Sequence, residues 1–179
     1  KKTLLDKHYD VIFVIGGNTF RLMHNLYDKG LIYPIRNAVL NYHKIFIGSS
    51  AGAIIAGPTI KTTTSIPIIN VPSLTALRLV EPQIYVHFYY KNLYYKHLKS
   101  FVKTMVSAEF LVKRFHEYNP KKNVLALLEG SFVGFLDDKV ILYRGGGRYY
   151  KKDKKPKTLR MSKKKKKGTD LSTIIYQNH

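Results

Sequence analysis

Two short apolar runs, each followed at once by glycine and a helix-start pattern, constrain the fold more than any other feature of the sequence. Residues 11–15 (VIFVI) end at a pair of glycines, and residues 45–47 (IFI) end at Gly48. Continuous apolar runs of this length are typical of strands that are covered on both faces. Strand-then-helix units of this kind predict an α/β fold, with a mostly parallel sheet sandwiched between helices.

The second half of the chain predicts one further helical region and several strands. Apolar residues at 98, 101, 102 and 105 recur at helical spacing, and the helical pattern continues to a stop at Asn119-Pro120. A strand is predicted at 83–87 and three more at 124–128, 132–136 and 140–143. The Asp-Asp pair at 137–138 predicts a hairpin turn between the last two strands.

Positive charge is concentrated near the C-terminus. The 179 residues carry a formal net charge of +20, and residues 151–167 alone hold ten lysines and Arg160 against Asp153. Because like charges repel and this run offers nothing apolar to bury, we expect one folded domain over residues 1–150 and a Lys-rich flexible tail over residues 151–179. Such a tail can bind nucleic acid, but AT-rich coding would produce it as well, so we assign it no function.

Composition excludes several classes of protein. The chain has no cysteine, which excludes a disulfide scaffold, a cysteine nucleophile and thiolate zinc sites and fits a reducing compartment. No apolar run approaches the roughly 20 residues that cross a bilayer. No His, Asp or Glu cluster has metal-ligand spacing. We therefore expect a cytoplasmic protein that needs no membrane, metal or cofactor.

The strongest local signal for chemistry is Gly48-x-Ser50-x-Gly52, between a predicted strand and a predicted helix. A sharp turn at this point projects the Ser50 hydroxyl above the sheet edge, and the two glycines relieve the crowding. The next backbone N–H, that of Ala51, would then point at a developing oxyanion. The pattern predicts a nucleophile elbow, although a plain tight turn would satisfy the same pentapeptide.

A serine nucleophile needs a base and an acid that orients it. His87 ends the predicted strand at 83–87, at the sheet edge where the elbow is expected, whereas the other histidines fall in polar or Lys-rich stretches. Glu129, which follows the strand at 124–128, is the best-placed carboxylate, and Glu81 and Asp28 are weaker candidates.

The other strand-to-helix turn contains Gly16 and Gly17. Two glycines there let backbone N–H groups approach a ligand, either as a second oxyanion donor or as an anion-binding nest at a helix N-terminus. The turn matches neither the dinucleotide-binding fingerprint nor the Walker pattern.

Four segments, in order along the chain, resemble the peptidase E family. They are IFVIGGNTF (12–20), GSSAGAIIAGPTIKTT (48–63), QIYVHF (83–88) and LEGS (128–131). The family comprises N-terminal-aspartyl dipeptidases related to cyanophycinase, with a class I glutamine amidotransferase-like α/β fold. The resemblance implies a triad of Ser50, His87 and Glu129, and a glycine-rich oxyanion turn at Gly16 and Gly17.

The sequence also departs from the family pattern. The family fold starts with further strand–helix units that have no counterpart before Lys1, so we expect an N-terminally truncated domain whose uncovered sheet favours homo-oligomers. Ile15 replaces the first of three glycines in the oxyanion turn, and Ser65 replaces an aspartate. An arginine that the family carries on the helix after the histidine is missing, so aspartyl specificity does not follow.

The prediction from the sequence is a serine peptidase that hydrolyses short peptides near their N-terminus. Ser50 attacks, His87 transfers the proton and Glu129 orients the imidazole. Ala51 and the glycine turn hold the oxyanion. The alternative is a catalytically degraded homologue that acts as a binding protein. An α/β-hydrolase esterase fits the elbow alone but not the chain order, because the best histidine precedes the best acid.

Overall fold

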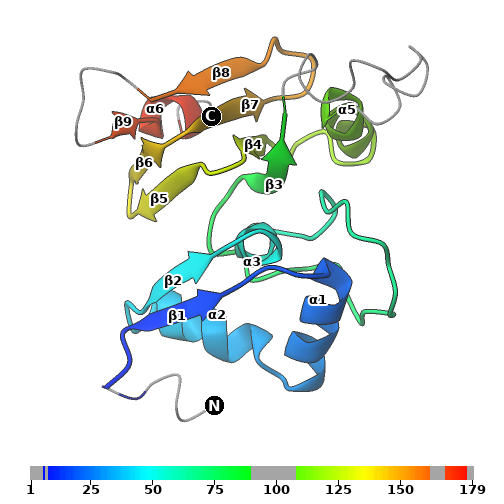
Figure 1. Ribbon diagram of the computed structural model, residues 1–179, viewed down its shortest axis with the longest axis vertical. Coiled ribbons are helices and arrows are strands. Elements are labelled where there is room, and N and C mark those ends of the chain that lie inside the picture. Colours follow the sequence, from blue (N-terminus) through cyan, green and yellow to red (C-terminus); the bar gives the residue numbers. More distant parts are fainter. Residues whose placement is uncertain (1–5, 7, 90–107, 162–167, 177–179) are drawn as a thin grey trace. The chain divides into compact units, whose positions relative to one another are not determined.

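The computed structural model describes residues 6, 8–89, 108–161 and 168–176, and the chain forms two compact units, residues 1–84 and 85–179. The boundary between the units falls within strand β3 (Gln83–Phe88) (Figure 1). Among the described residues, no helix combines the length and the apolar character that crossing a membrane requires. The helix predicted around residues 98–105 lies outside the described residues.

The described part of the first unit contains a two-stranded parallel sheet and three helices. Its elements are β1 (Val11–Val14), α1 (Thr19–Asp28), α2 (Ile32–Leu40), β2 (Ile45–Gly48) and α3 (Ala51–Ala56). The two strands pair in register from Val11 opposite Ile45 to Val14 opposite Gly48. Both predicted strand–glycine–helix units therefore form, and their glycine turns follow the same edge of the sheet.

Within the described residues of the first unit, only one face of this sheet is covered, contrary to the prediction of two covered faces. The odd-numbered apolar side chains are between 41% and 66% exposed, while their even-numbered neighbours are partly buried. The exposed set comprises Val11, Phe13, Ile15, Ile45 and Ile47. An apolar run is compatible with burial on both faces, but it does not supply the elements that would cover them.

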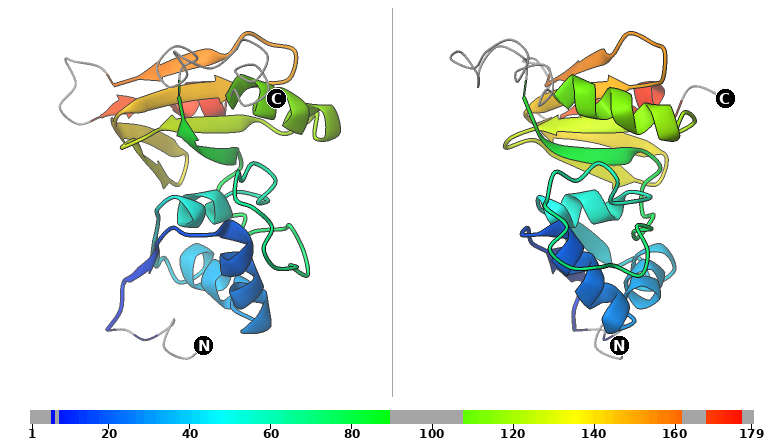
Figure 2. Two further views of the ribbon diagram at one scale, coloured as in Figure 1. Left: turned by 45° about the vertical axis from the view of Figure 1, so that its right-hand side comes forward. Right: turned by 90° about the vertical axis from the view of Figure 1, so that its right-hand side faces the viewer.

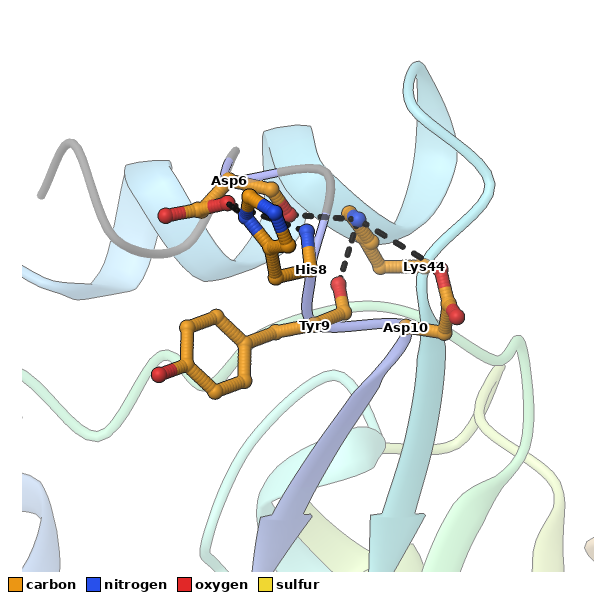
Figure 3. Close-up of polar contacts among 5 residues, drawn as sticks. All are labelled: Asp6, His8, Tyr9, Asp10 and Lys44. Carbon is orange, nitrogen blue, oxygen red and sulfur yellow. Dashed lines mark hydrogen bonds and ion pairs between the residues drawn. The ribbon is translucent and has the colours of Figure 1, made fainter.

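A lysine anchors the segment before β1 to the start of β2. Lys44 Nζ donates hydrogen bonds to the backbone carbonyl oxygens of Asp6, at 3.0 Å, and of Tyr9, and it lies 3.7 Å from Asp10 Oδ1 (Figure 3). The Asp6 carboxylate accepts from the backbone N–H of His8 at 3.0 Å, and this bond lowers the pKa of Asp6. The contacts of Lys44 thus join the entry of β1 to the entry of β2.

The second unit contains most of the strands. After β3 come α5 (Ala108–Tyr118), β4 (Val124–Leu128), β5 (Phe132–Leu136), β6 (Lys139–Arg144), β7 (Gly146–Tyr150), β8 (Lys157–Arg160), β9 (Thr169–Asp170) and α6 (Ser172–Ile175). They form a sheet in the order β3-β4-β7-β8 and another in the order β5-β6-β9. The strands predicted at 124–128, 132–136 and 140–143 are confirmed, as is the hairpin turn, where Asp137 has φ 49°.

The mixed α/β class is confirmed, but a mostly parallel sheet is not found. Among the strand pairs whose register is defined in the described part of the chain, β1–β2 is parallel, and β4–β7, β5–β6, β6–β9 and β7–β8 are antiparallel. Several connections in the second unit are short turns, and these can join only antiparallel neighbours.

Helix α5 packs against the sheet of the second unit. The buried cluster there consists of Tyr85, Phe88, Ala108, Val112, Phe115, Val124, Ala126 and Tyr150. The Phe88 and Tyr150 rings meet edge to face, with centroids 6.2 Å apart. Aromatic pairs prefer this geometry, which ties β3 to β7 beneath the helix.

The flexible tail predicted over residues 151–179 is wrong for the part of it that the structure describes. Residues Lys157–Arg160 form β8 and pair with β7, and Leu159 is only 1% exposed. Leu171 and Ile175 are also buried. Because successive side chains of a strand point to opposite faces of the sheet, Leu159 is buried while its neighbours Thr158 and Arg160 are exposed. Residues 162–167, with five of the lysines, lie outside the described residues.

Candidate active site

Ser50 occupies the sharp turn between β2 and α3. Its backbone has φ 52° and ψ −114°, a positive φ that side-chain-bearing residues rarely adopt. Such strain is typical of functional turns, and a strand–Ser–helix turn of this kind is the geometry of a nucleophile elbow. The elbow predicted from Gly48-x-Ser50-x-Gly52 is therefore present in its conformation.

The elbow leaves no room for a side chain at Gly48 or Gly52. A Cβ at Gly48 would lie 2.4 Å from the carbonyl oxygen of Gly52, and a Cβ at Gly52 would lie 2.0 Å from that of Val14. The backbone N–H of Ser49 also donates to the Val14 carbonyl, at 2.9 Å. The elbow is thus packed directly on the end of β1, with no room for a side chain between them.

The glycine turn after β1 lies against the serine. A Cβ at Gly16 would stand 2.8 Å from Ser50 Cβ and 3.2 Å from Ser50 Oγ. Gly17 has φ 125°, which favours glycine, and a Cβ there would meet nothing within 4 Å. Gly16 is therefore needed for close approach to Ser50, and Gly17 for its backbone conformation. Ala51 directly follows Ser50, begins α3 and is buried.

In the second unit, His87 and Glu129 form a hydrogen-bonded pair. His87 Nδ1 lies 2.5 Å from Glu129 Oε2, and the two side chains are 53% and 80% exposed. His87 lies in β3 with φ 56°, and Glu129 follows β4, next to Gly130 at φ 71°. A carboxylate that accepts from Nδ1–H selects the tautomer in which Nε2 is the basic nitrogen.

The predicted site residues therefore form two groups. Ser50, Ala51 and Gly16 lie together in residues 1–84, and His87 and Glu129 lie together in residues 85–179. Among the described residues, no group of three or more His, Asp or Glu side chains could hold a metal ion.

Ser65 belongs to a cluster of hydroxyl groups at the N-terminus of α1. The backbone N–H of Thr19 donates to Ser65 Oγ at 3.2 Å, and Thr63 Oγ1 donates to Thr19 Oγ1 at 2.9 Å. Thr19 is 1% exposed. Asn18 supports the same junction, because its Nδ2 donates to the Ile66 carbonyl at 2.8 Å.

Sequence reasoning did not identify Thr19 or Thr63 as part of this region. Threonines are common in loops and at helix starts, so neither residue carries a local signal. Their contact joins positions 44 residues apart, and it fixes the segment that follows the Gly16-Gly17 turn. Ser65 thus lies at the helix start directly after the predicted oxyanion turn.

Comparison with known proteins identifies the family. The model of peptidase family S51 matches residues 1–143. The chain belongs to peptidase family S51. The resemblance to peptidase E drawn from the sequence segments is confirmed by this match.

Individual S51 relatives agree with the assignment. The chain is 37% identical to a peptidase E of Nostoc sp. over 138 residues, which are 77% of this chain and 54% of the relative. It is 46% identical to a peptidase E of Shewanella sp. (strain MR-4) over 82 residues, 46% of this chain and 34% of the relative. The chain thus spans between about a third and a half of these curated relatives' length.

A solved structure is also similar. It is a crystal structure from Listeria monocytogenes EGD-e named "Putative Peptidase E Protein", with a TM-score of 0.50 and 27% identity. The similarity covers 89% of this chain and 63% of that one. The fold is therefore peptidase E-like.

Proposed function

We propose that this chain is a serine peptidase that hydrolyses short peptides near their N-terminus. The observation that carries the proposal is the strained Ser50 backbone, at φ 52°, with Gly16 packed against its side chain. This turn places the Ser50 hydroxyl close to the Gly16-Gly17 turn, and acyl transfer requires a nucleophilic hydroxyl with backbone N–H donors for the oxyanion nearby. Membership of family S51 supports the same class of chemistry.

In the proposed reaction, Ser50 Oγ attacks the carbonyl carbon of the scissile peptide bond while its proton passes to His87 Nε2. The backbone N–H of Ala51, with that of Gly16 or Gly17, stabilises the resulting oxyanion. When the C–N bond breaks, the proton passes from Nε2 to the leaving amine. Water then attacks the acyl-serine while His87 Nε2 takes its proton, and that proton passes to Ser50 Oγ when the acyl C–O bond breaks, which releases the acid and restores Ser50.

Glu129 acts through the histidine. Its contact with Nδ1, at 2.5 Å, holds the ring in the tautomer that leaves Nε2 basic and stabilises the imidazolium that forms during the reaction. A carboxylate 80% exposed provides this at less desolvation cost than a buried one. No cofactor or metal takes part in the proposed steps.

The proposed substrates are short peptides without a strong preference for an N-terminal aspartate. Ser65 is uncharged, stands where the resemblance places an aspartate, and hydrogen-bonds to the start of α1 through Thr19. The family's arginine on the helix after the histidine is missing here, and Val106-Ser107-Ala108-Glu109 stands near that position in the sequence. An acidic substrate side chain would therefore lack its usual ionic partner.

A fluorophosphonate probe tests the proposal, because it labels only serines that are activated as nucleophiles. We expect the full chain to be labelled, and labelling to be lost in Ser50→Ala and strongly reduced in His87→Ala. Ser49→Ala is the matched control, since it removes the adjacent hydroxyl and should leave labelling unchanged. A folded chain that is not labelled would favour the alternative, a degraded homologue that binds rather than cleaves.

A further inference from the structure

Two lysine-bearing connections of the second unit meet at one end of the β3-β4-β7-β8 sheet. The turn from α5 to β4 carries Lys121 and Lys122. The β7–β8 connection carries four lysines, and Lys157 begins β8 directly after it. The register of β4 and β7 pairs Val124 with Tyr150, so the residues just before β4 lie beside those just after β7. Figures 1 and 2 show α5 and the β7–β8 connection at this same end of the sheet.

A buried histidine lies between the two connections. His116 is 7% exposed, and its Nε2 lies 2.9 Å from the carbonyl oxygen of Lys122, to which it donates. Burial lowers the pKa of His116, and the nearby charges of Asp153 and Lys152 act on it in opposite directions. The His116 imidazole therefore contacts the α5–β4 turn, and it lies close enough to the β7–β8 connection for the charges of Lys152 and Asp153 to act on it.

Lysines outnumber carboxylates at this end of the sheet, which we call the basic end. Seven lysines face one carboxylate: Lys121, Lys122, Lys151, Lys152, Lys154, Lys155 and Lys157, with Asp153. All of them except Lys151 are exposed. The nearest acidic residue on α5, Glu117, is paired with Arg114 at 2.8 Å. A fixed cluster of this sign attracts polyanions, because each bound phosphate releases condensed counterions.

An exposed aromatic ring accompanies the lysines. Tyr118, the last residue of α5, is 82% exposed and stands three positions before Lys121. The other large apolar side chains exposed in the described part of the second unit are Leu111, Phe132, Leu136, Tyr143 and Met161, and none lies in either connection. A lipid surface would need aliphatic side chains to insert, whereas a nucleobase needs one accessible ring face.

We propose that the basic end binds single-stranded nucleic acid, with phosphates at the exposed lysines and a base stacked on Tyr118. Lysines and an aromatic ring in one exposed cluster are the combination that binds single strands without sequence preference. The β7–β8 connection also lies beyond residue 143, where the family match ends. The proposal is independent of the chemistry at Ser50.

The test is fluorescence anisotropy of the full-length chain with a labelled oligothymidylate over a series of salt concentrations. One variant combines Lys121→Ala with Lys122→Ala, and another combines Lys154→Ala with Lys155→Ala. The control combines Lys29→Ala with Lys139→Ala, two exposed lysines outside the basic end. All forms keep residues 163–167, so any contribution of that run is common to them.

We expect each basic-end pair to reduce the slope of log K against log salt by about 1.4, since a single strand contributes about 0.7 per phosphate contact. The control pair should leave the slope unchanged. Replacing Lys154 and Lys155 by arginine should restore it, because the charge is retained. Equal slopes for the wild type and the basic-end pairs, or an equal loss in the control, would overturn the proposal.

Tyr118 separates stacking from charge. Tyr118→Ala should weaken binding without changing the salt slope, while Tyr118→Phe should bind like the wild type. Equal weakening in both would overturn the stacking contact. Vesicles that contain phosphatidylserine provide the last arm: if the lysine pairs reduce vesicle binding while oligothymidylate binding is unaffected, the surface is a lipid site and the nucleic-acid proposal is wrong.

Discussion

His87 Nδ1 and Glu129 Oε2 lie 2.5 Å apart although 42 positions separate the two residues in the sequence. The end of β3 and the end of β4 bring them together, and both strands belong to one sheet. A hydrogen bond of this length between imidazole and carboxylate fixes the ring and its tautomer at once. The consequences of this pair for activity can be measured directly.

Glu129→Gln should lower kcat less than Glu129→Ala does. The amide oxygen can still accept from Nδ1–H and hold the ring, but it cannot stabilise the imidazolium, whereas alanine does neither. Rates on a short neutral peptide, with the thermal midpoint of each variant as a check on folding, give the comparison. Equal losses in the two variants would mean that Glu129 does not orient His87.

Ser50→Ala and His87→Ala should each lower kcat by roughly 10⁴–10⁶, since members of a triad act as a unit. Combining the two changes should cost little more than either alone. The double-mutant cycle needs only kcat for four forms of the protein. Additive losses would show that the two residues act in separate steps and would contradict the proposed triad.

Gly16→Ala should impair activity more than it impairs folding. The added methyl group would stand 2.8 Å from Ser50 Cβ, so the serine must move, and misplacement of about 1 Å can cost on the order of 10²-fold in rate. Gly17→Ala is the matched control, because it adds a methyl group in open space but strains a backbone at φ 125°. It should lower the thermal midpoint more and fluorophosphonate labelling less than Gly16→Ala.

Ser65→Asp should raise the rate on Asp-X dipeptides if the family's aspartate serves catalysis or substrate capture. A carboxylate at this position would also be stabilised by the N-terminus of α1, where Ser65 now accepts from Thr19. Ser65→Asn is the matched control, with a similar shape and no charge. Brisk cleavage of Asp-X dipeptides by the unmodified chain would contradict the proposed loss of aspartyl preference.

Stability should fall as the pH is lowered through the range below about 6.5, and His116 should account for part of the fall. Burial lowers the pKa of His116 in the folded chain, so the unfolded chain binds the proton more readily between the folded pKa and 6.5. His116→Gln keeps a donor for the Lys122 carbonyl and should flatten this part of the profile. Thermal midpoints measured from pH 5 to pH 8 check it, and an unchanged slope in the variant would contradict the assignment.

The local parts of the fold could be predicted from the sequence because their signals are local. β1, β2 and the sharp turn at Ser50 each follow from an apolar run and adjacent glycines, and the structure contains both strands and the turn. The resemblance to peptidase E rests in part on the same segments, since two of its four segments contain the end of β1 and the turn at Ser50. What these segments share is that a few neighbouring residues determine the backbone.

The parts that could not be predicted depend on distant partners. Leu159 lies among lysines, and only its pairing with Gly147 on β7 shows that it is buried. The contact between Ser65 and Thr19 spans 46 positions and carries no motif. The exposure of one face of β1 and β2 could not be predicted for the same reason. An apolar run shows that a strand can be buried on both faces, but it does not show whether another element covers each face.

The anchor formed by Lys44 has a consequence for how this chain can diverge. Its two hydrogen bonds go to the backbone carbonyl oxygens of Asp6 and Tyr9, which every amino acid provides. Mutations that change the side chains at those two positions therefore leave the attachment intact, whereas a change at position 44 removes it. Natural variation should accordingly accumulate in the segment before β1 while the lysine persists.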